Sequence, residues 1–282
     1  MLTKLYADHS YLLESGLLYE TDVAFFKRVS EDMDDSDASL ALYQLSDYLC
    51  RYYGKKVIIL LDEYDTPMQE AYVNGYWEEL VGFSRSMFNA AFNPWLERAM
   101  MTGITRVSKE SIFSDLNNLK VVTTTSDEYA TSFGFTEKEV FEALEECHLS
   151  EEREQVKHWY DGFMFGTHSD IYNPWSILNF LDTRRYTTYW ANTSSNSMIG
   201  KLLREGNRQI KEKFERLLCG ESIKSPIDEQ IVYNQLDGNE RAVWSLLLAS
   251  GYLKVLSYEQ YSEIPEGNQP QYELSITNLE VK

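Results

Sequence analysis

The chain has 282 residues and a net charge of −19, from 26 Lys plus Arg against 45 Asp plus Glu. Apolar residues make up 43% and charged residues 25%, which is ordinary for a globular protein and excludes a wholly disordered chain. A surface this negative repels a phosphate backbone, so broad nucleic-acid binding is not expected without a local basic face.

Targeting and metal signals are absent from the sequence. No stretch approaches the roughly 18 apolar residues of a membrane span, and the N-terminus lacks the apolar region of a signal peptide. Cys50, Cys147 and Cys219 are far apart and odd in number. This spacing excludes a CxxC metal site, argues against a disulfide framework and favours a reducing cytoplasm.

The first half of the chain predicts helices followed by a sheet. Residues 1–56 look mostly helical and acidic, with a helix over 38–53. The apolar run 57–61 favours a central parallel strand buried on both faces, and 68–92 predicts one long helix that Pro94 ends. Further strands are expected at 99–104 and 121–125. Alternating strands and helices indicate an α/β sheet.

The pattern changes after residue 130. Thr136 and Glu139 have the spacing of a capping box, which predicts a helix start at 136. Charged helical periodicity covers 201–218, and an apolar helix over 241–249 is followed by a strand that begins near Gly251. The turn formers of 263–270 predict a hairpin loop.

The strongest chemical signal is the sequence Leu60-Leu61-Asp62-Glu63, an apolar strand that ends in two acids. This is the Walker B pattern of P-loop NTPases, in which the first acid holds Mg²⁺ and the second orients or deprotonates the attacking water. An ordinary strand followed by a solvated acidic turn gives the same pattern.

A second signal follows the next expected strand, where Thr105 and Arg106 come directly after residues 99–104. A polar and a cationic side chain at the tip of a neighbouring strand would sense a γ-phosphate and stabilise transition-state charge. A surface arginine at a sheet edge is the alternative.

Several long segments resemble a family of bacterial predicted AAA-ATPase-like proteins, which is similar to the STAND group of signal-transduction NTPases. The segments, in the family's order, are LLDEYDTP, LERAMMTGITRVSKESIFSDLNNL, FGFTEKEV, WYDGFMFG, YNPWSILNFL and LLLASGYLKV. The resemblance covers residues from about 40 to the end. Members of this family often carry a PD-(D/E)XK nuclease-like domain at the C-terminus.

The resemblance implies roles for individual positions. Asp62 and Glu63 match the Walker B acids, and Thr105 with Arg106 matches the sensor strand. Asn173-Pro174 sits where related NTPases place a Pro-containing turn that opens a lid helix beside the nucleotide. A plain helix start, with Asn173 as cap and Pro174 at the first helical position, explains the same residues.

One part of the family pattern is missing. No GxxxxGK[ST] loop occurs, and the Gly-Lys pairs at 54–55 and 200–201 lack its context. Without that loop the phosphates lose their main cradle, so the chain is expected to bind ATP weakly or not at all. A truncated reading frame, a fragment and a degenerate copy all account for the absence.

Two further patterns have structural alternatives. The final LEVK contains an ExK like that of PD-(D/E)XK nucleases, but no companion acidic strand follows it. Basic residues in 201–224, with the helix and strand over 241–255, favour a winged-helix-like module. The apolar later helix favours packing on the ATPase core over DNA binding.

The sequence therefore predicts an α/β fold in three parts. These are a partial P-loop NTPase sheet over 1–130 without Walker A, a helical lid over 131–200 and a winged-helix-like module over 201–282. The expected function is Mg²⁺-ATP binding, with slow hydrolysis as a regulatory switch in the complete protein. The alternative is a non-enzymatic protein-interaction or scaffold module. A protein partner and a cytoplasmic location are expected, and a nucleic-acid or membrane partner is not.

Overall fold

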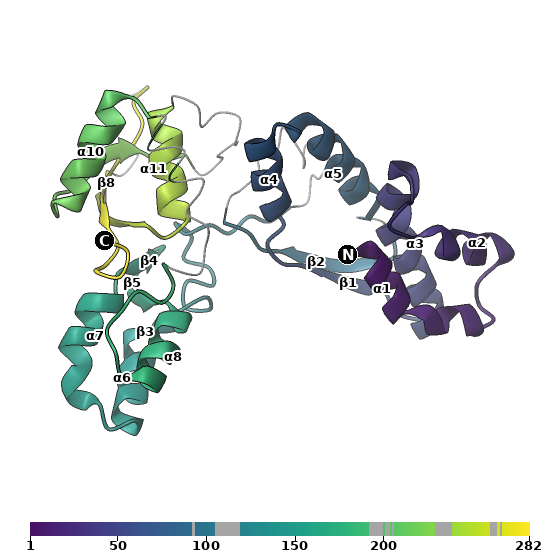
Figure 1. Cartoon of the computed structure of the whole chain (residues 1–282), viewed down its shortest axis with the longest axis horizontal. Helices are drawn as coiled ribbons and strands as arrows, with labels where there is room; N and C mark the ends of the chain where they lie inside the picture. The colour runs from purple at the N-terminus through teal and green to yellow at the C-terminus, as the bar shows by residue number, and fades with distance from the viewer. Residues whose placement is uncertain are drawn as a thin grey trace. The chain divides into compact units, whose positions relative to one another are not determined.

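The computed structural model describes residues 1–91, 94–104, 119–191, 200, 204, 206–228, 239–259, 264–265 and 267–282. The chain divides into two compact units, Met1–Leu119 and Lys120–Lys282. Figure 1 shows their elements. Within the described residues the fold is mixed α/β, as the sequence predicted.

The first unit begins with helices and continues into a small parallel sheet (Figure 1). Its elements are α1 (Leu2–Asp8), η1 (Ser10–Glu14), α2 (Glu20–Arg28), α3 (Asp35–Tyr53), β1 (Val57–Leu61), α4 (Thr66–Asn74), α5 (Trp77–Ala91) and β2 (Leu96–Met101). Asp34 caps α3 by accepting the N–H of Asp37 at 2.7 Å, so this helix begins three residues before the expected position 38.

One helical expectation is corrected. The single helix expected over 68–92 is divided at Gly75, which has φ +80° and donates its N–H to the carbonyl of Ala71 at 2.9 Å. A left-handed residue at this position ends a helix, and glycine adopts it without a steric penalty. The following helix, α5, ends at Ala91, before Pro94.

The limits of the second expected strand and the number of strands differ from the expectation. The second strand covers Leu96–Met101 and not 99–104, and residues 121–125 form no strand. A turn occupies that segment, because the N–H of Ser126 donates to the carbonyl of Thr123 at 3.0 Å. The threonines there have β-branched side chains, but the segment pairs with no described strand.

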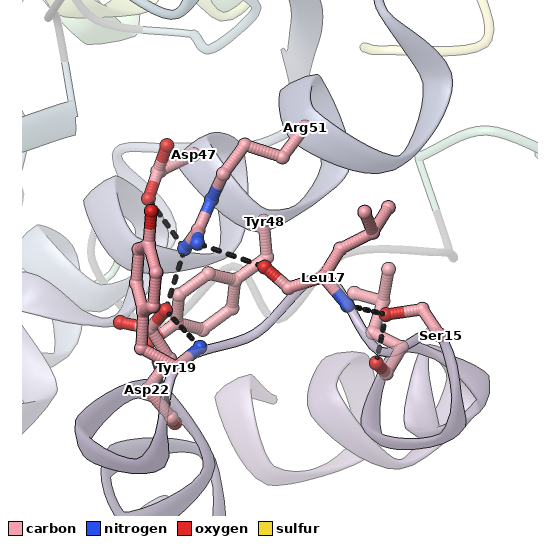
Figure 2. Close-up of polar contacts among 8 residues, drawn as sticks. Ser15, Leu17, Tyr19, Asp22, Asp47, Tyr48 and Arg51 are labelled. Carbon is pink, nitrogen blue, oxygen red and sulfur yellow. Dashed lines mark hydrogen bonds and ion pairs between the residues drawn. The ribbon is translucent and has the colours of Figure 1, made fainter.

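Arg51 of α3 forms an ion pair with Asp22 of α2 and so connects the two helices (Figure 2). Its Nη2 lies 2.8 Å from Asp22 Oδ2 on α2 and 2.8 Å from Asp47 Oδ2, one turn earlier on α3. The guanidinium also lies over two tyrosine rings, 5.2 Å from the Tyr19 centroid and 5.3 Å from that of Tyr48. One cation thus joins an ion-pair network and an aromatic pair at the edge of the core.

The core of the first unit is formed by the same helices. Its buried members are Tyr6, Leu12, Phe25, Phe26, Val29, Ala41, Leu45 and Tyr48. Four of them are aromatic. This fits the aromatic-rich composition, because one aromatic ring removes as much apolar surface from water as two small side chains.

The second unit contains two three-stranded antiparallel sheets, each with helices (Figure 1). The first part holds β3 (Phe135–Thr136), α6 (Glu137–Glu146), η2 (Ser150–Glu152), α7 (Arg153–Tyr160), β4 (Phe163–Phe165), β5 (His168–Tyr172) and α8 (Pro174–Thr183), with strand order β3-β5-β4. The capping box of Thr136 and Glu139 is confirmed. The small sheet in this part was not expected from the sequence.

The rest of the second unit holds α10 (Arg208–Leu218), β6 (Ile223–Pro226), α11 (Glu240–Ala249), β7 (Leu253–Tyr258) and β8 (Gln271–Ile276). Its sheet order is β6-β8-β7, and both pairings are antiparallel. The hairpin expected around residues 263–270 is confirmed as the connection between β7 and β8. The helix expected over 201–218 is described from Arg208 to Leu218.

A partly buried carboxyl group lies between α7 and β4 in the first part of this unit. Asp161 follows α7, and burial raises the pKa of its carboxyl group to about 6, with a further rise from the negative charge of Asp170. Lys157 lowers this pKa, but it is already engaged by Asp170 at 2.9 Å and by Glu137. Ionisation of Asp161 is therefore less favourable in the folded unit than in the unfolded chain.

We expect Arg51→Met to lower the free energy of unfolding of the first unit by about 1–3 kcal/mol, because two partly buried carboxylates lose their cation. The matched control is Arg28→Met, whose ion pair with Asp37 has an arginine side chain that is 56% exposed, and its expected effect is clearly smaller. Native-state hydrogen exchange of the buried α3 amides measures both values. Equal effects of the two substitutions would contradict the role given to Arg51.

We expect Asp161→Asn to stabilise the second unit in a pH-dependent way. The raised pKa means that the wild-type unit binds this proton more tightly than the unfolded chain, so it loses stability as pH rises from about 4 to above 6. The asparagine variant avoids that loss and should be more stable by about 1–2 kcal/mol at pH 7.5, with no such advantage near pH 4.

Urea denaturation, followed by the amide signals of α6, measures this difference. Asp182→Asn, a change of an exposed carboxyl on α8, serves as the control and should alter stability by less than about 0.5 kcal/mol at either pH. A stabilisation by Asp161→Asn that is the same at both pH values would show that burial of the charge is not its cause.

Candidate functional site

The candidate site lies at the carboxyl ends of β1 and β2, which are paired in parallel. The pairing continues beyond the strands, because the N–H of Thr102 donates to the carbonyl of Leu61 at 2.9 Å. The N–H of Tyr64 then donates to the carbonyl of Thr102 at 3.0 Å. Residues 62–64 and 102–103 are thereby held at one edge of the sheet, where α/β proteins bind ligands.

Asp62 is oriented by two donors. Its Oδ1 accepts the hydroxyl of Thr102 and, at 3.1 Å, the N–H of Glu63. The side chain is exposed. Both hydrogen bonds go to Oδ1 and fix the direction of this exposed carboxyl group, which suits a hard cation such as Mg²⁺ that keeps most of its waters.

Glu63 occupies an uncommon backbone conformation. Its φ is +51°, in the left-handed region that residues with a side chain rarely adopt. The carbonyl of Glu63 accepts the N–H of Thr66 at 3.1 Å, and its own N–H faces both Asp62 Oδ1 and the hydroxyl of Thr102, the latter at 3.4 Å. These bonds hold the sharp turn and leave the Glu63 side chain exposed.

A buried acid lies beside this turn. Asp65 is 1% exposed and immediately precedes α4. A Cβ placed on Gly103 would lie 2.6 Å from Asp65 Oδ1 and 2.9 Å from the ring of Tyr64. A side chain at residue 103 would therefore displace the side chains of Asp65 and Tyr64.

The strand that carries Asp62 is not buried as expected. Ile58 is 61% and Leu60 76% exposed, and Met100, paired with Leu60, is 51% exposed. Side chains alternate along a strand, so Ile58 and Leu60 share one face, and Asp62 follows directly after the strand. The expectation of a strand buried on both faces is wrong for the described residues. One face is open, and it leads to the candidate carboxylate.

The other predicted site residues are not brought to this edge by any described contact. Thr105 and Arg106 lie outside the described residues. Asn173 and Pro174 belong to the second unit, where Asn173 Oδ1 accepts the N–H groups of Trp175 at 2.9 Å and Ser176 at 3.3 Å. A capped helix start with proline at the first position is therefore confirmed, and nucleotide contact there stays a prediction.

The final Glu-x-Lys has a structural explanation. Glu280 is 2% exposed, and its carboxyl oxygens accept hydrogen bonds from Ser176, Tyr189 and Trp190. A carboxyl group used in this way has no free oxygen pair facing solvent for a catalytic metal. The nuclease interpretation of Glu280 gains no support from this geometry.

The basic stretch of α10 is largely neutralised. Arg208 pairs with Glu212 at 2.6 Å, and Arg216 pairs with Glu221 at 2.8 Å. Lys213 lies 2.5 Å from Glu240. Seven of the ten residues of α11 are buried, which leaves that helix no face for a DNA groove. These contacts bury α11 within the second unit, and packing of this module on the ATPase-like part stays a prediction.

Within the described ranges there is no group of three or more His, Cys, Asp or Glu residues that could hold a metal ion alone. No helix among those same residues is long and apolar enough to cross a membrane.

Comparisons with known proteins relate part of the chain to a family. Residues 14–113 match the model of the family described as "Predicted AAA-ATPase". The chain is also 26% identical over 232 residues to an Azotobacter chroococcum mcd 1 protein described as "Uncharacterized protein in vnfD 5'region". That match covers 81% of this chain and 42% of the relative, so the chain spans about two fifths of the relative's length. No solved structure matches significantly.

We expect Thr102→Val to loosen the Asp62–Glu63 turn, because valine keeps the shape of threonine and removes the hydroxyl that Asp62 accepts. Amide exchange of Glu63 should rise about tenfold, while the stability of the first unit falls by about 1 kcal/mol. Thr66→Val, an exposed change four residues after Asp62, is the control and should leave Glu63 exchange unchanged. Unaltered Glu63 exchange in Thr102→Val would contradict the orienting role of the hydroxyl.

Proposed function

We propose that this chain is the part of a regulatory nucleotide-binding protein that supplies the metal-holding acid. The observation that carries the proposal is the Asp62 carboxyl group, fixed by Thr102 at the carboxyl end of a parallel strand pair. The match of residues 14–113 to a predicted AAA-ATPase family supports a nucleotide as the ligand. The proposed ligand is Mg²⁺-ATP.

The residues present fit the metal. Asp62 offers one oriented carboxyl oxygen at an exposed position, and Mg²⁺ is commonly held by one or two carboxylates together with water and phosphate oxygens. Mg²⁺ would supply neutralisation of the charge on the phosphate groups. In this proposal Glu63, one residue further along the turn, orients or deprotonates a water molecule.

Three further roles are proposed from the sequence resemblance. Arg106 would stabilise transition-state charge and Thr105 would sense the terminal phosphate. Asn173 and Pro174 would place the first turn of α8 near the nucleotide, since helix N-termini favour anions. Nucleotide binding would then act as a switch, because it would change the orientation of the α6–α8 part relative to the sheet.

The residues present do not fit the phosphates. The 282 residues contain no GxxxxGK[ST] loop, and the helix that follows β1 begins beside Asp62, Glu63 and Asp65. Three acids at that helix start repel an anion. We therefore propose that tight ATP binding requires polypeptide that this sequence does not contain. The greater length of the Azotobacter chroococcum relative supports this.

The proposal includes the division into an ATPase-like part over 1–130, a lid over 131–200 and a winged-helix-like module over 201–282. The helix–strand–helix–strand–strand order from α10 to β8, with sheet order β6-β8-β7, supports the last of these. The scattered cysteines support a cytoplasmic location. We further propose the signal-transduction (STAND-like) class for the complete protein.

A protein-interaction module is the second candidate, and one observation favours it. The open face formed by Ile58, Leu60 and Met100 is apolar, whereas parallel sheets are normally covered on both sides. A protein that binds this face without any nucleotide would make the chain a scaffold.

Binding measurements test the proposal. Calorimetry with the 282-residue chain should show no low-micromolar affinity for ATP. Mn²⁺, which replaces Mg²⁺ at oxygen ligands, should broaden the NMR signals of residues 61–64 and 102–103 more strongly when ATP is present. Asp62→Asn should abolish this broadening, and Asp35→Asn on distant α3 should not.

Two outcomes would contradict the proposal. If the broadening persists in Asp62→Asn, the metal binds at residues other than Asp62. Tight ATP binding by the chain would show that the missing loop is unnecessary.

A further inference from the structure

The last residues of the chain return from β8 to the helices of the first part of the second unit. Thr277 is buried, and its hydroxyl donates to the carbonyl of Gly251 at 2.7 Å. Three residues later the N–H of Glu280 donates to the carbonyl of Trp159, at the end of α7, at 3.2 Å. The tail is therefore tied at two points by its backbone and a hydroxyl.

Glu280 adds the strongest tie. Its Oε1 accepts the N–H groups of Tyr189 at 2.7 Å and Trp190 at 2.6 Å, and its Oε2 accepts the hydroxyl of Ser176 at 2.7 Å. The three donors precede Glu280 by 90 to 104 residues. Both oxygens of a nearly fully buried acid are thus satisfied, and each bond holds a different point of the upstream chain.

Gly162 shows that the tail passes close to the end of α7. A Cβ on Gly162, which has φ +130°, would lie 2.2 Å from the carbonyl oxygen of Thr277, so this contact depends on close backbone approach. A Cβ on Gly251 would lie 2.6 Å from a ring carbon of Phe163 and 3.3 Å from the ring of Trp190, so a side chain there would displace these rings.

The contact with Ser176 connects this joint to a specific helix end. Ser176 lies in the first turn of α8, and its N–H is one of the two that Asn173 caps. The hydrogen bond from the Ser176 hydroxyl to Glu280 restrains this turn from outside the helix. The capping hydrogen bond from the Ser176 N–H to Asn173 Oδ1 is long, at 3.3 Å. The position of Asn173 and Pro174 then depends on the C-terminal tail.

We propose that Glu280 is a positioning residue that holds the first turn of α8, and with it Asn173 and Pro174, in place from the segment that follows β8. The link to nucleotide rests on the proposed function, which assigns those two residues to the lid side of the site. Glu280 follows β8 and accepts the hydroxyl of Ser176 in α8. In this proposal a displacement of the sheet β6-β8-β7 therefore displaces the first turn of α8, and a displacement of α8 moves the sheet.

Hydrogen exchange tests this directly. Ser176→Ala removes only the hydroxyl, and amides in the first turn of α8 should exchange at least about fivefold faster, while Tyr189, Trp190 and the amides of α6 change less than about twofold. Glu280→Ala should accelerate Tyr189 and Trp190 by at least about tenfold as well, because both N–H groups lose their acceptor.

Two more variants separate positioning from general destabilisation. Glu280→Gln keeps an acceptor for both N–H groups and an amide that the Ser176 oxygen accepts, so it should restore near wild-type exchange. Glu273→Gln, on β8 and bonded to Ser222 and Ser257, is the matched control and should leave α8 unchanged. If Glu280→Ala does not fold, Ser176→Ala and Glu280→Gln still decide the question.

Unchanged exchange of the first turn of α8 in Ser176→Ala would overturn the proposal, as would an equal acceleration of the α6 amides. Mg²⁺-ATP at millimolar concentration, added to the wild-type chain, tests the nucleotide link separately. If ATP leaves α8 exchange unaltered while Ser176→Ala accelerates it, the nucleotide role of Asn173 and Pro174 fails and the positioning role of Glu280 stands.

Discussion

The parallel pairing of β1 with β2 is the constraint on which the candidate site depends. Parallel strands bring their carboxyl ends to the same edge, so Asp62 and Thr102 meet although 40 residues separate them. An antiparallel partner would place the start of the second strand beside Asp62. The hydroxyl that orients the carboxyl group, the turn at Glu63 and the close approach of Gly103 to Asp65 all follow from this direction of pairing.

The exposed apolar face of the same sheet supports the proposal that tight ATP binding requires additional polypeptide. Ile58 and Leu60 leave apolar surface in water on a strand whose sequence is that of a buried one. The hydrophobic effect favours covering such a face, and the face ends at Asp62. A segment that covered it would also lie beside the candidate metal ligand, which is where a phosphate cradle is required.

The sequence predicted local features well and tertiary ones less well. Apolar runs and capping residues identified β1 to the residue and the starts of α6 and α8, because these signals act within a few residues. The limits of β2 were misplaced because Thr102 and Ile104 are β-branched, like strand residues, although the ladder ends at Met101. Thr102 was therefore missed as the partner of Asp62. The burial of Glu280 was not predictable, because its three donors are about 100 residues away.

Scalar couplings across hydrogen bonds, measured by NMR on the 282-residue chain, test whether Asp62 lies at the end of a parallel strand pair. We expect the parallel pairing, with couplings from the N–H of Thr102 to the carbonyl of Leu61 and from the N–H of Tyr64 to the carbonyl of Thr102. Couplings that instead match an antiparallel register for residues 57–61 would contradict it, because Thr102 would then lie far from Asp62.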